Sequence, residues 1–251
     1  MIRFFIPLLL YAGFLFCNPA PLCSQEAVGV SIRVSTEPGM FPRKWYGKKI
    51  DARAEPLDSS CTELVDKTIR SGLSRYPAPL LNKYLERVYI ARSLRFYGFP
   101  YGGTYSKKRI YLTCDSSNPN YTARSLEFSL HHELSSILWK ENMSRLKPKE
   151  WMALNPDGFI YGEGGANAIR SGVATMDYEP GLYMIGFLND YSVADLEQDI
   201  NVFAQNLFSG GAAFWKIADE NPPILAKARL LIRFYNALDP MFTELYFRQI
   251  E

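Results

Sequence analysis

Apolar residues in the first half of the chain follow two spacings, which predict its secondary structure. Partial alternation over 28–35 indicates a strand. Helical recurrence over 59–71, with serines at its start and Gly72 after it, predicts a helix with a suitable beginning and end. The other elements expected here are a short helix and two strands, over 80–85, 87–96 and 109–113. The expected order is therefore strand, helix, helix, strand, strand.

Helical spacing dominates the second half. Helices are expected over 125–142 and 192–208, and a third begins after two prolines and ends at Pro240. The glycine-rich segment 161–165 lies in a loop between helices, and its spacing matches neither common phosphate-binding pattern, so a plain turn is expected there. The sequence contains no internal repeat and no interdomain linker. A single domain over 25–251 is expected.

Composition limits the class of protein. The 251 residues include 28 Lys and Arg against 26 Asp and Glu, and 47% are hydrophobic. Disorder needs low hydrophobicity and high net charge, so a folded chain is indicated. A net charge of +2 also argues against a nucleic-acid binder held by bulk positive potential.

The first 24 residues have the layout of a secretory signal peptide. A short cationic start precedes an apolar run over 4–16, and prolines then interrupt the pattern. The run is short for a bilayer span, which takes roughly 20 residues. Residues 1–24 are therefore expected to direct the chain to a secreted, periplasmic or other extracytoplasmic location, without a membrane span in the mature form. The alternative is a leader that is retained as a membrane anchor.

Cysteine use is compatible with such a compartment. Cys17 and Cys23 would leave with the leader, so that Cys61 and Cys114 remain. An oxidising compartment permits a disulfide between them. Two separate buried thiols are the alternative. Their spacing is not a metal-binding motif.

The only two histidines of the chain, His131 and His132, are adjacent in the expected helix over 125–142. On a helical projection the leucines and isoleucine of this segment form one apolar stripe. His132 and Ser136 project from the other side, and Glu133 lies at the border. One side of this helix therefore offers an imidazole, a hydroxyl and a neighbouring carboxylate.

This helix resembles the active-site helix of the zincin metallopeptidases, whose HExxH motif holds zinc with two histidines four residues apart. The segment HHELSS provides His132 and Glu133, but Ser136 stands where the second histidine belongs. In the gluzincin branch a glutamate from a later helix is the third ligand. The counterpart here follows Gly186-Phe187 and Tyr191, and the ligand position falls on Glu197 or on Gln198.

The resemblance implies an α+β, zincin-like fold: a small mixed sheet packed on the active-site helix, followed by a mostly helical C-terminal half. It implies zinc bound by His132 and Glu197, with Glu133 as the general base in hydrolysis of a peptide or protein substrate. His131 is the first candidate to replace the missing ligand. The alternative is a noncatalytic envelope or extracellular binding module on the same scaffold. A monomer is expected in either case.

A basic and aromatic segment, 43–49, lies outside this resemblance. It combines four cations with Trp45 and Tyr46. It is expected to be a solvated loop with its aromatic rings folded under, and contact with an anionic surface is the alternative.

Overall fold

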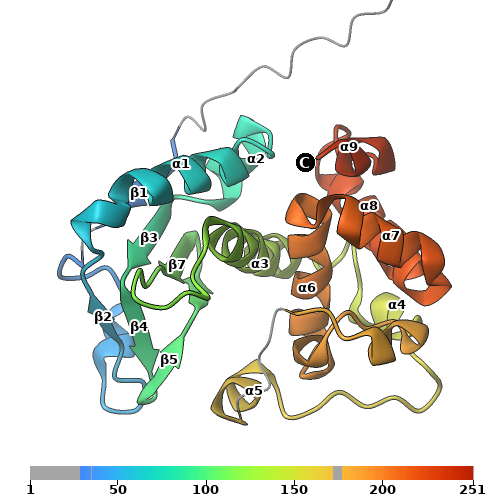
Figure 1. Ribbon diagram of the computed structural model, residues 1–251, viewed down its shortest axis with the longest axis horizontal. Helices are drawn as coiled ribbons and strands as arrows, with labels where there is room; N and C mark the ends of the chain where they lie inside the picture. Colours follow the sequence, from blue (N-terminus) through green and yellow to red (C-terminus); the bar gives the residue numbers. More distant parts are fainter. Residues whose placement is uncertain (1–28, 35, 172–176, 251) are drawn as a thin grey trace, which may run out of the picture.

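Strands occupy the N-terminal half of the molecule and helices dominate the C-terminal half (Figure 1). The computed structural model describes residues 29–34, 36–171 and 177–250. The predicted signal peptide, 1–24, lies outside these residues. The predicted α+β class, with a mostly helical second half, is confirmed.

Two small sheets form the N-terminal half. The main sheet has the strand order β1-β3-β7-β6, with bounds Ser31–Arg33, Arg87–Ala91, Arg109–Thr113 and Gly103–Ser106. Its first three strands are parallel, whereas β6 is antiparallel to β7 and lies at the edge. The second sheet is antiparallel and has the order β2-β4-β5, with bounds Arg53–Glu55, Ser93–Phe96 and Phe99–Tyr101.

The chain divides its strands more finely than the sequence predicts. The expected strand over 87–96 is two strands, β3 and β4, which belong to different sheets and are separated by a bend at Arg92. The segment expected to join two strands contains β5 and the start of β6. Tyr97 and Gly98, with φ of 56° and 82°, form the turn between β4 and β5. Strands β5 and β6 lack the apolar alternation by which sequence analysis finds a strand.

The alternation within β3 and β7 assigns each face of the main sheet to a different cluster. Val88 and Ile110 pack with the helices in the larger core. Tyr89 and Tyr111 point to the opposite face, where their rings stack with centroids 5.3 Å apart against the residues around Phe41. Both faces are covered, as expected for a mainly parallel sheet.

Helix α3 (Ala123–Glu141) lies between the sheet and the C-terminal helices (Figure 1). It begins at a capping box, in which the Thr122 hydroxyl accepts from the backbone N–H of Ser125 at 3.1 Å and the Thr122 N–H donates to the Ser125 hydroxyl at 2.7 Å. Helices α1 (Thr62–Leu73) and α6 (Leu196–Ser209) pack against it. Its polar side is therefore buried as well.

The remaining helices complete the two halves. Helix α2 spans Ala78–Tyr84, and the long α8, expected after the two prolines, spans Pro222–Leu238. The helices α4, α5, α7 and α9, which the sequence analysis did not predict, span Pro148–Met152, Gly165–Ser171, Gly211–Glu220 and Glu244–Gln249. Single 3-10 turns cover Arg43–Tyr46 (η1), Ser59–Cys61 (η2), Pro180–Ile185 (η3) and Asp190–Val193 (η4). Within the described ranges no helix combines the length and apolar character needed to cross a bilayer.

The two cysteines that would remain in the mature chain are free thiols in the structure. Cys114 is buried, and burial raises the pKa of its thiol. The described structure therefore contains two separate thiols and no disulfide between them, but only Cys114 is buried as the alternative expected, whereas Cys61 is partly exposed.

A buried ion pair stabilises the C-terminal half. Lys227 Nζ lies 2.7 Å from Asp199 Oδ2, and both side chains are fully buried. Trp151 Nε1 and the Tyr161 hydroxyl donate to the same carboxylate oxygen, each at 2.7 Å. The ammonium group also lies 3.7 Å from the centroid of the Phe187 ring. The pair is therefore desolvated but closely surrounded by compensating groups.

The substitution Lys227→Met should lower the free energy of unfolding by about 3–5 kcal/mol, because it leaves the Asp199 carboxylate buried without its counter-charge. Urea denaturation followed by circular dichroism measures this change. The double variant Lys227→Met/Asp199→Asn should recover part of the loss, and Lys216→Met on α7 serves as an unrelated lysine control. A loss below about 1 kcal/mol in the single variant would show that the pair has no such role.

Candidate functional site

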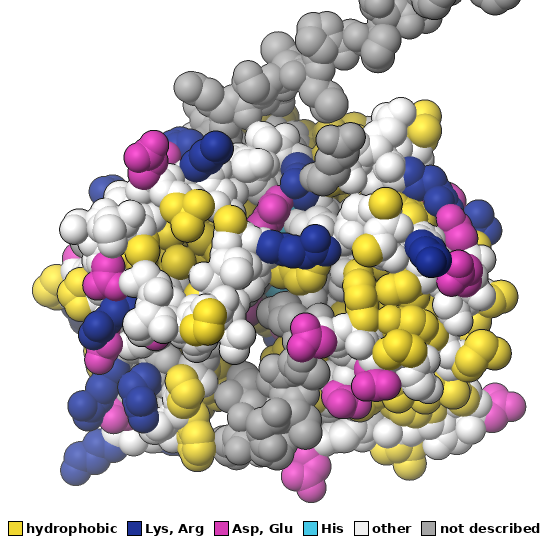
Figure 2. All heavy atoms as spheres, in the orientation of Figure 1, with side chains coloured by type: hydrophobic (Ala, Val, Ile, Leu, Met, Phe, Trp, Pro, Cys, Tyr) yellow, Lys and Arg dark blue, Asp and Glu magenta, His cyan; other side chains and the backbone are white. Residues whose placement is uncertain are grey.

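Except for His131, the candidate site residues from the sequence line a small cavity of about 110 Å³ between the sheet edge and the helices. β6 supplies Gly103 and Tyr105, and α3 supplies His132, Glu133 and Ser136. The opposite wall comes from η4 and α6, with Tyr191, Glu197, Gln198 and Asn201. Figure 2 shows this face hollowed between the two halves, with a histidine side chain visible inside the hollow.

Two glutamines of α6 hold the His132 ring. Its Nε2 lies 2.8 Å from Gln198 Oε1, and its Nδ1 lies 3.0 Å from Gln205 Oε1. The ring of Tyr191 stacks on the imidazole with centroids 5.8 Å apart. The His132 side chain is 5% exposed. Both ring nitrogens are therefore occupied by protein groups.

The protonation state of His132 follows from this burial. Desolvation lowers its pKa, and the hydrogen bonds to Gln205 and Gln198 only partly oppose the shift. The neutral imidazole has one N–H donor and one acceptor nitrogen. One glutamine must then accept from the ring through its carbonyl and the other must donate through its amide NH₂. Amide groups can do both, whereas a carboxylate can only accept.

A third amide of α6 contacts the serine that replaces the expected zinc ligand. Asn201 Nδ2 donates to Ser136 Oγ at 2.6 Å, and both residues are buried. Gln198, Asn201 and Gln205 occupy positions i, i+3 and i+7, so they form one polar row on the face of α6 that meets α3. Sequence analysis considered Gln198 but missed Asn201 and Gln205. Their helical spacing from Gln198, which places the three amides on one face of the helix, is the signal that could have found them.

Glu197, the expected third ligand, has different partners. The Tyr105 hydroxyl donates to its Oε1 at 2.7 Å, and Lys140 Nζ lies 2.8 Å from its Oε2. Burial acts to raise the pKa of Glu197, but the bonds from Lys140 and Tyr105 outweigh it and hold the pKa below the usual range. Lys140 also donates to the Tyr105 hydroxyl. The structure thus brings Gln198, rather than Glu197, into contact with His132.

Glu133 lies in the cavity without a lysine or hydroxyl partner of the kind that Glu197 has. Its side chain is 9% exposed, and no described residue hydrogen-bonds its carboxyl group. Burial, followed by the charge of Glu197, raises its pKa to about 8 from the usual 4.5, with Lys140 acting in the opposite sense. Gly103 leaves room for it, because a Cβ at that position would lie 3.0 Å from Glu133 Oε1. The carboxyl group is therefore protonated for the most part at neutral pH.

The glycine-rich segment expected to be a plain turn forms part of the cavity wall. A Cβ at Gly165 would lie 2.7 Å from Gln198 Nε2, so a larger residue there would displace the Gln198 side chain from its observed position. Asp195 connects the segment to α6, since its Oδ2 accepts from the Gly165 N–H at 2.7 Å and its Oδ1 accepts from the Gln198 N–H at 2.8 Å. The expected helix start near 192 is therefore an N-cap at Asp195.

His131, the first candidate for a replacement ligand, lies in a separate buried cluster. Its Nδ1 is 2.8 Å from the Tyr76 hydroxyl, and its Nε2 is 3.7 Å from Glu127 Oε1. Its ring stacks on Phe208 with centroids 4.9 Å apart. Burial lowers the pKa of His131 to about 4. The structure therefore places His131 in the packing around α3 rather than in the cavity.

The donor set around His132 does not fit zinc. Protein zinc sites use imidazole, thiolate and carboxylate ligands. Here Ser136 and Gln198 offer neutral oxygens, while Glu197 is engaged by a lysine. Over the part of the chain that the structure describes, no three His, Cys, Asp or Glu side chains gather as a metal-binding group. The assignment of His132 and Glu197 as ligands and of Glu133 as general base stays a prediction.

Comparison with known proteins finds a solved structure with a similar fold. No protein-family model matches the chain, and the search of curated proteins found no match. Among solved structures it is similar to the crystal structure of a proposed zinc-binding metallo-peptidase from Bacteroides caccae ATCC 43185, at 13% sequence identity and a TM-score of 0.53. The alignment covers 89% of this chain and 84% of that chain. The likeness shows a metallopeptidase-like fold and does not extend to activity.

Removing the Glu133 carboxyl group should remove a pH dependence of stability. The native state retains the proton up to a pKa of about 8, whereas the unfolded chain loses it near the usual 4.5. The stability that this group contributes is therefore present at low pH and is lost as the pH rises through this window. The free energy of unfolding should fall between pH 5 and pH 8 by about 3 kcal/mol more in the wild type than in Glu133→Gln.

Urea denaturation at both pH values measures this difference. The glutamine variant is the matched control, since it has nearly the same shape and no proton to lose, and titrating groups that do not interact with Glu133 contribute equally to both chains. Parallel pH profiles for the two proteins would contradict the shifted ionisation.

Proposed function

We propose that this chain is a noncatalytic binding protein on a metallopeptidase-like scaffold, which holds a peptide in the cavity without cleaving it. The observation that carries the proposal is the engagement of both His132 nitrogens by Gln198 and Gln205. Side-chain amides satisfy the imidazole where a peptidase would need it to bind a metal ion. Asn201 similarly occupies the Ser136 hydroxyl.

The exposed edge of the sheet supports peptide as the ligand class. The Thr113 N–H donates to the Gly102 carbonyl at 2.8 Å, so these residues form a hydrogen-bonded pair of the β6–β7 ladder. Because such pairs alternate in antiparallel strands, the backbone groups of Gly103 and Tyr105 point away from β7. Both residues line the cavity. An extended peptide could therefore add to this edge beside the cavity.

Zinc binding by designed variants tests the claim that the wild-type site does not hold a metal ion. The wild-type chain should bind zinc weakly, and Ser136→His/Gln198→Glu should bind one zinc per chain at least about a hundredfold more tightly, because it supplies an imidazole and a carboxylate beside His132. Isothermal titration calorimetry with zinc chloride measures both affinities. Adding His132→Ala to the double variant should abolish the gain.

Tight zinc binding by the wild-type chain would refute this part of the proposal. If that binding were lost in both His132→Ala and Glu197→Gln, it would establish the ligands predicted from the sequence. Cleavage of fluorogenic peptides that is lost in Glu133→Gln would likewise establish the catalytic alternative.

Peptide binding is tested with a pool of random octapeptides passed over the immobilised protein. The wild type should retain peptides, and mass spectrometry should recover them uncleaved. Gly103→Val should reduce retention about tenfold, because its side chain enters the space in front of Glu133. Gly102→Val is the matched control, since a Cβ there meets no atom within 4 Å. Equal retention by the two variants, or no retention by the wild type, would refute peptide binding in this cavity.

A further inference from the structure

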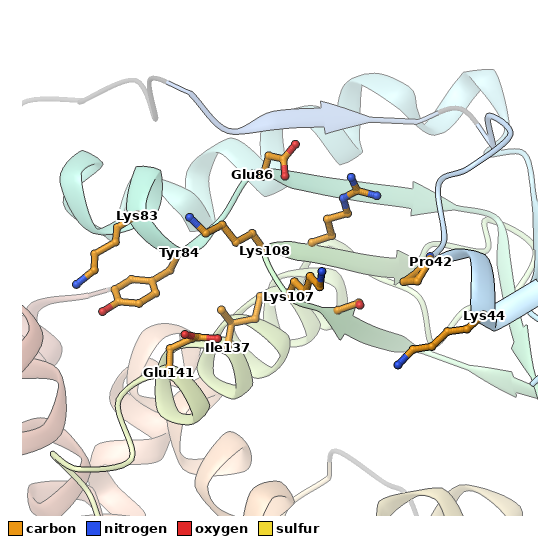
Figure 3. A pocket seen from close by; sticks show the side chains of 11 residues that line it. Pro42, Lys44, Lys83, Tyr84, Glu86, Lys107, Lys108, Ile137 and Glu141 are labelled. Atoms are coloured by element: carbon orange, nitrogen blue, oxygen red, sulfur yellow. The ribbon is translucent and has the colours of Figure 1, made fainter.

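A second and larger cavity, a groove of about 1140 Å³, lies beside the main sheet (Figure 3). Its rim carries Lys44 from η1, Lys83 from α2, and Lys107 and Lys108 from the turn between β6 and β7. Together with one arginine and two glutamates, these residues leave a local excess of three positive charges. The whole chain carries a net charge of only +2, so the positive charge is concentrated at this groove.

The lysines of the groove have no acidic partner within the described residues. No described carboxylate forms an ion pair with any of the four, and Lys83 instead lies over the ring of Tyr84, 4.7 Å from its centroid. Glu86, one of the two acids of the groove, pairs with Arg87 at 3.2 Å. Tyr84 and Ile137 give the groove an apolar part between the charges. The groove therefore offers uncompensated cations and an apolar surface to a ligand.

The turn at the centre of the groove is not explained by local backbone preference. Lys107 has φ of 53°, in the left-handed region where glycine is favoured and other residues are strained. A glycine would satisfy this turn better. The lysine at this position thus adds positive charge at a cost in local stability.

The groove and the cavity that contains His132 share two elements, β6 and α3. Strand β6 lines the cavity with Gly103 and Tyr105 and lines the groove with its last residue, Ser106. Helix α3 lines the cavity with His132, Glu133 and Ser136, and it lines the groove with Ile137 and Glu141. An extended chain pairing with β6 would therefore pass from one to the other. Lys107 follows Gly103 by four positions, a distance of about 13 Å along a strand.

We infer that the basic groove is a specificity subsite for acidic residues of the bound polypeptide, about four positions away from the residue that lies beside Glu133. This inference rests on the proposed peptide binding along β6. The concave shape and the continuity with a strand edge favour a polypeptide over a bilayer, whose flat surface could not follow the groove. The partner is thus a chain with an acidic segment next to an uncharged one.

Three biotinylated peptide pools test the subsite. Each consists of random uncharged pentapeptides flanked on both sides by four glutamates, four glutamines or four lysines, and their affinities are measured by biolayer interferometry at 50 mM and 300 mM salt. The glutamate pool should bind the wild type about tenfold more tightly than the glutamine pool at low salt, and the difference should shrink at high salt. The lysine pool should bind most weakly.

The variant Lys44→Gln/Lys83→Gln/Lys107→Gly should lose the preference for glutamate while retaining the glutamine pool. The glycine suits the turn, so the fold is expected to persist, and Lys149→Gln on α4 is the matched control. Equal affinities of the glutamate and glutamine pools for the wild type would overturn the subsite but leave peptide binding intact. Failure of every pool would instead indicate that the proposed function itself is wrong.

Two further ligands complete the test. Phosphatidylglycerol vesicles and heparin carry negative charge without a polypeptide backbone. If either bound more tightly than the glutamate pool and lost its binding in the triple variant, the groove would belong to a lipid or polysaccharide and the inference would be overturned. Weaker binding of both supports an acidic polypeptide.

Discussion

The packing of α3 against α6 buries a row of polar side chains, and the whole candidate site depends on how these groups satisfy one another. An imidazole or hydroxyl buried without a partner costs about 1–3 kcal/mol. Gln198, Asn201 and Gln205 meet this requirement for His132 and Ser136. Because amides both donate and accept, they can hold a neutral histidine without a metal ion or a charged partner. The same contacts align the two helices and so determine the shape of the cavity.

The two acids of the cavity show how position decides ionisation. Glu197 meets a lysine and a tyrosine hydroxyl, which keep it charged in spite of its burial. Glu133 lies close by with no described hydrogen-bond partner, and its raised pKa reflects burial together with the charge of Glu197. A carboxyl group in that state can accept or donate a hydrogen bond to a ligand. The site thus offers an adaptable polar group beside a strand edge, which suits recognition of a peptide backbone.

The charge of the surface changes between the cavity and the groove. The cavity is lined by neutral and acidic groups, whereas the adjoining groove presents lysines that no described acid neutralises. Of the two aromatic residues in the basic segment 43–49, Trp45 folds against Phe96 and Tyr111 as expected, whereas Tyr46 is exposed. Lys44 nevertheless reaches the groove. A segment that the sequence indicated as a solvated loop therefore contributes to a concave charged surface, because the fold brings it next to the β6–β7 turn.

The sequence by itself determined the α+β class, the long helices and the position of His132 and Glu133 on one helix. These features are local, since periodicity and capping depend on residues only a few positions apart. Short elements such as β5, β6 and α5 escaped detection, because tertiary pairing rather than local pattern stabilises them. Only the tertiary structure decided that Gln198 and Gln205 meet His132 while Glu197 turns to Lys140. Neighbouring residues on a helix point about 100° apart, so the rotation of α6 against α3, set by many packing contacts at once, selects which side chain reaches the site.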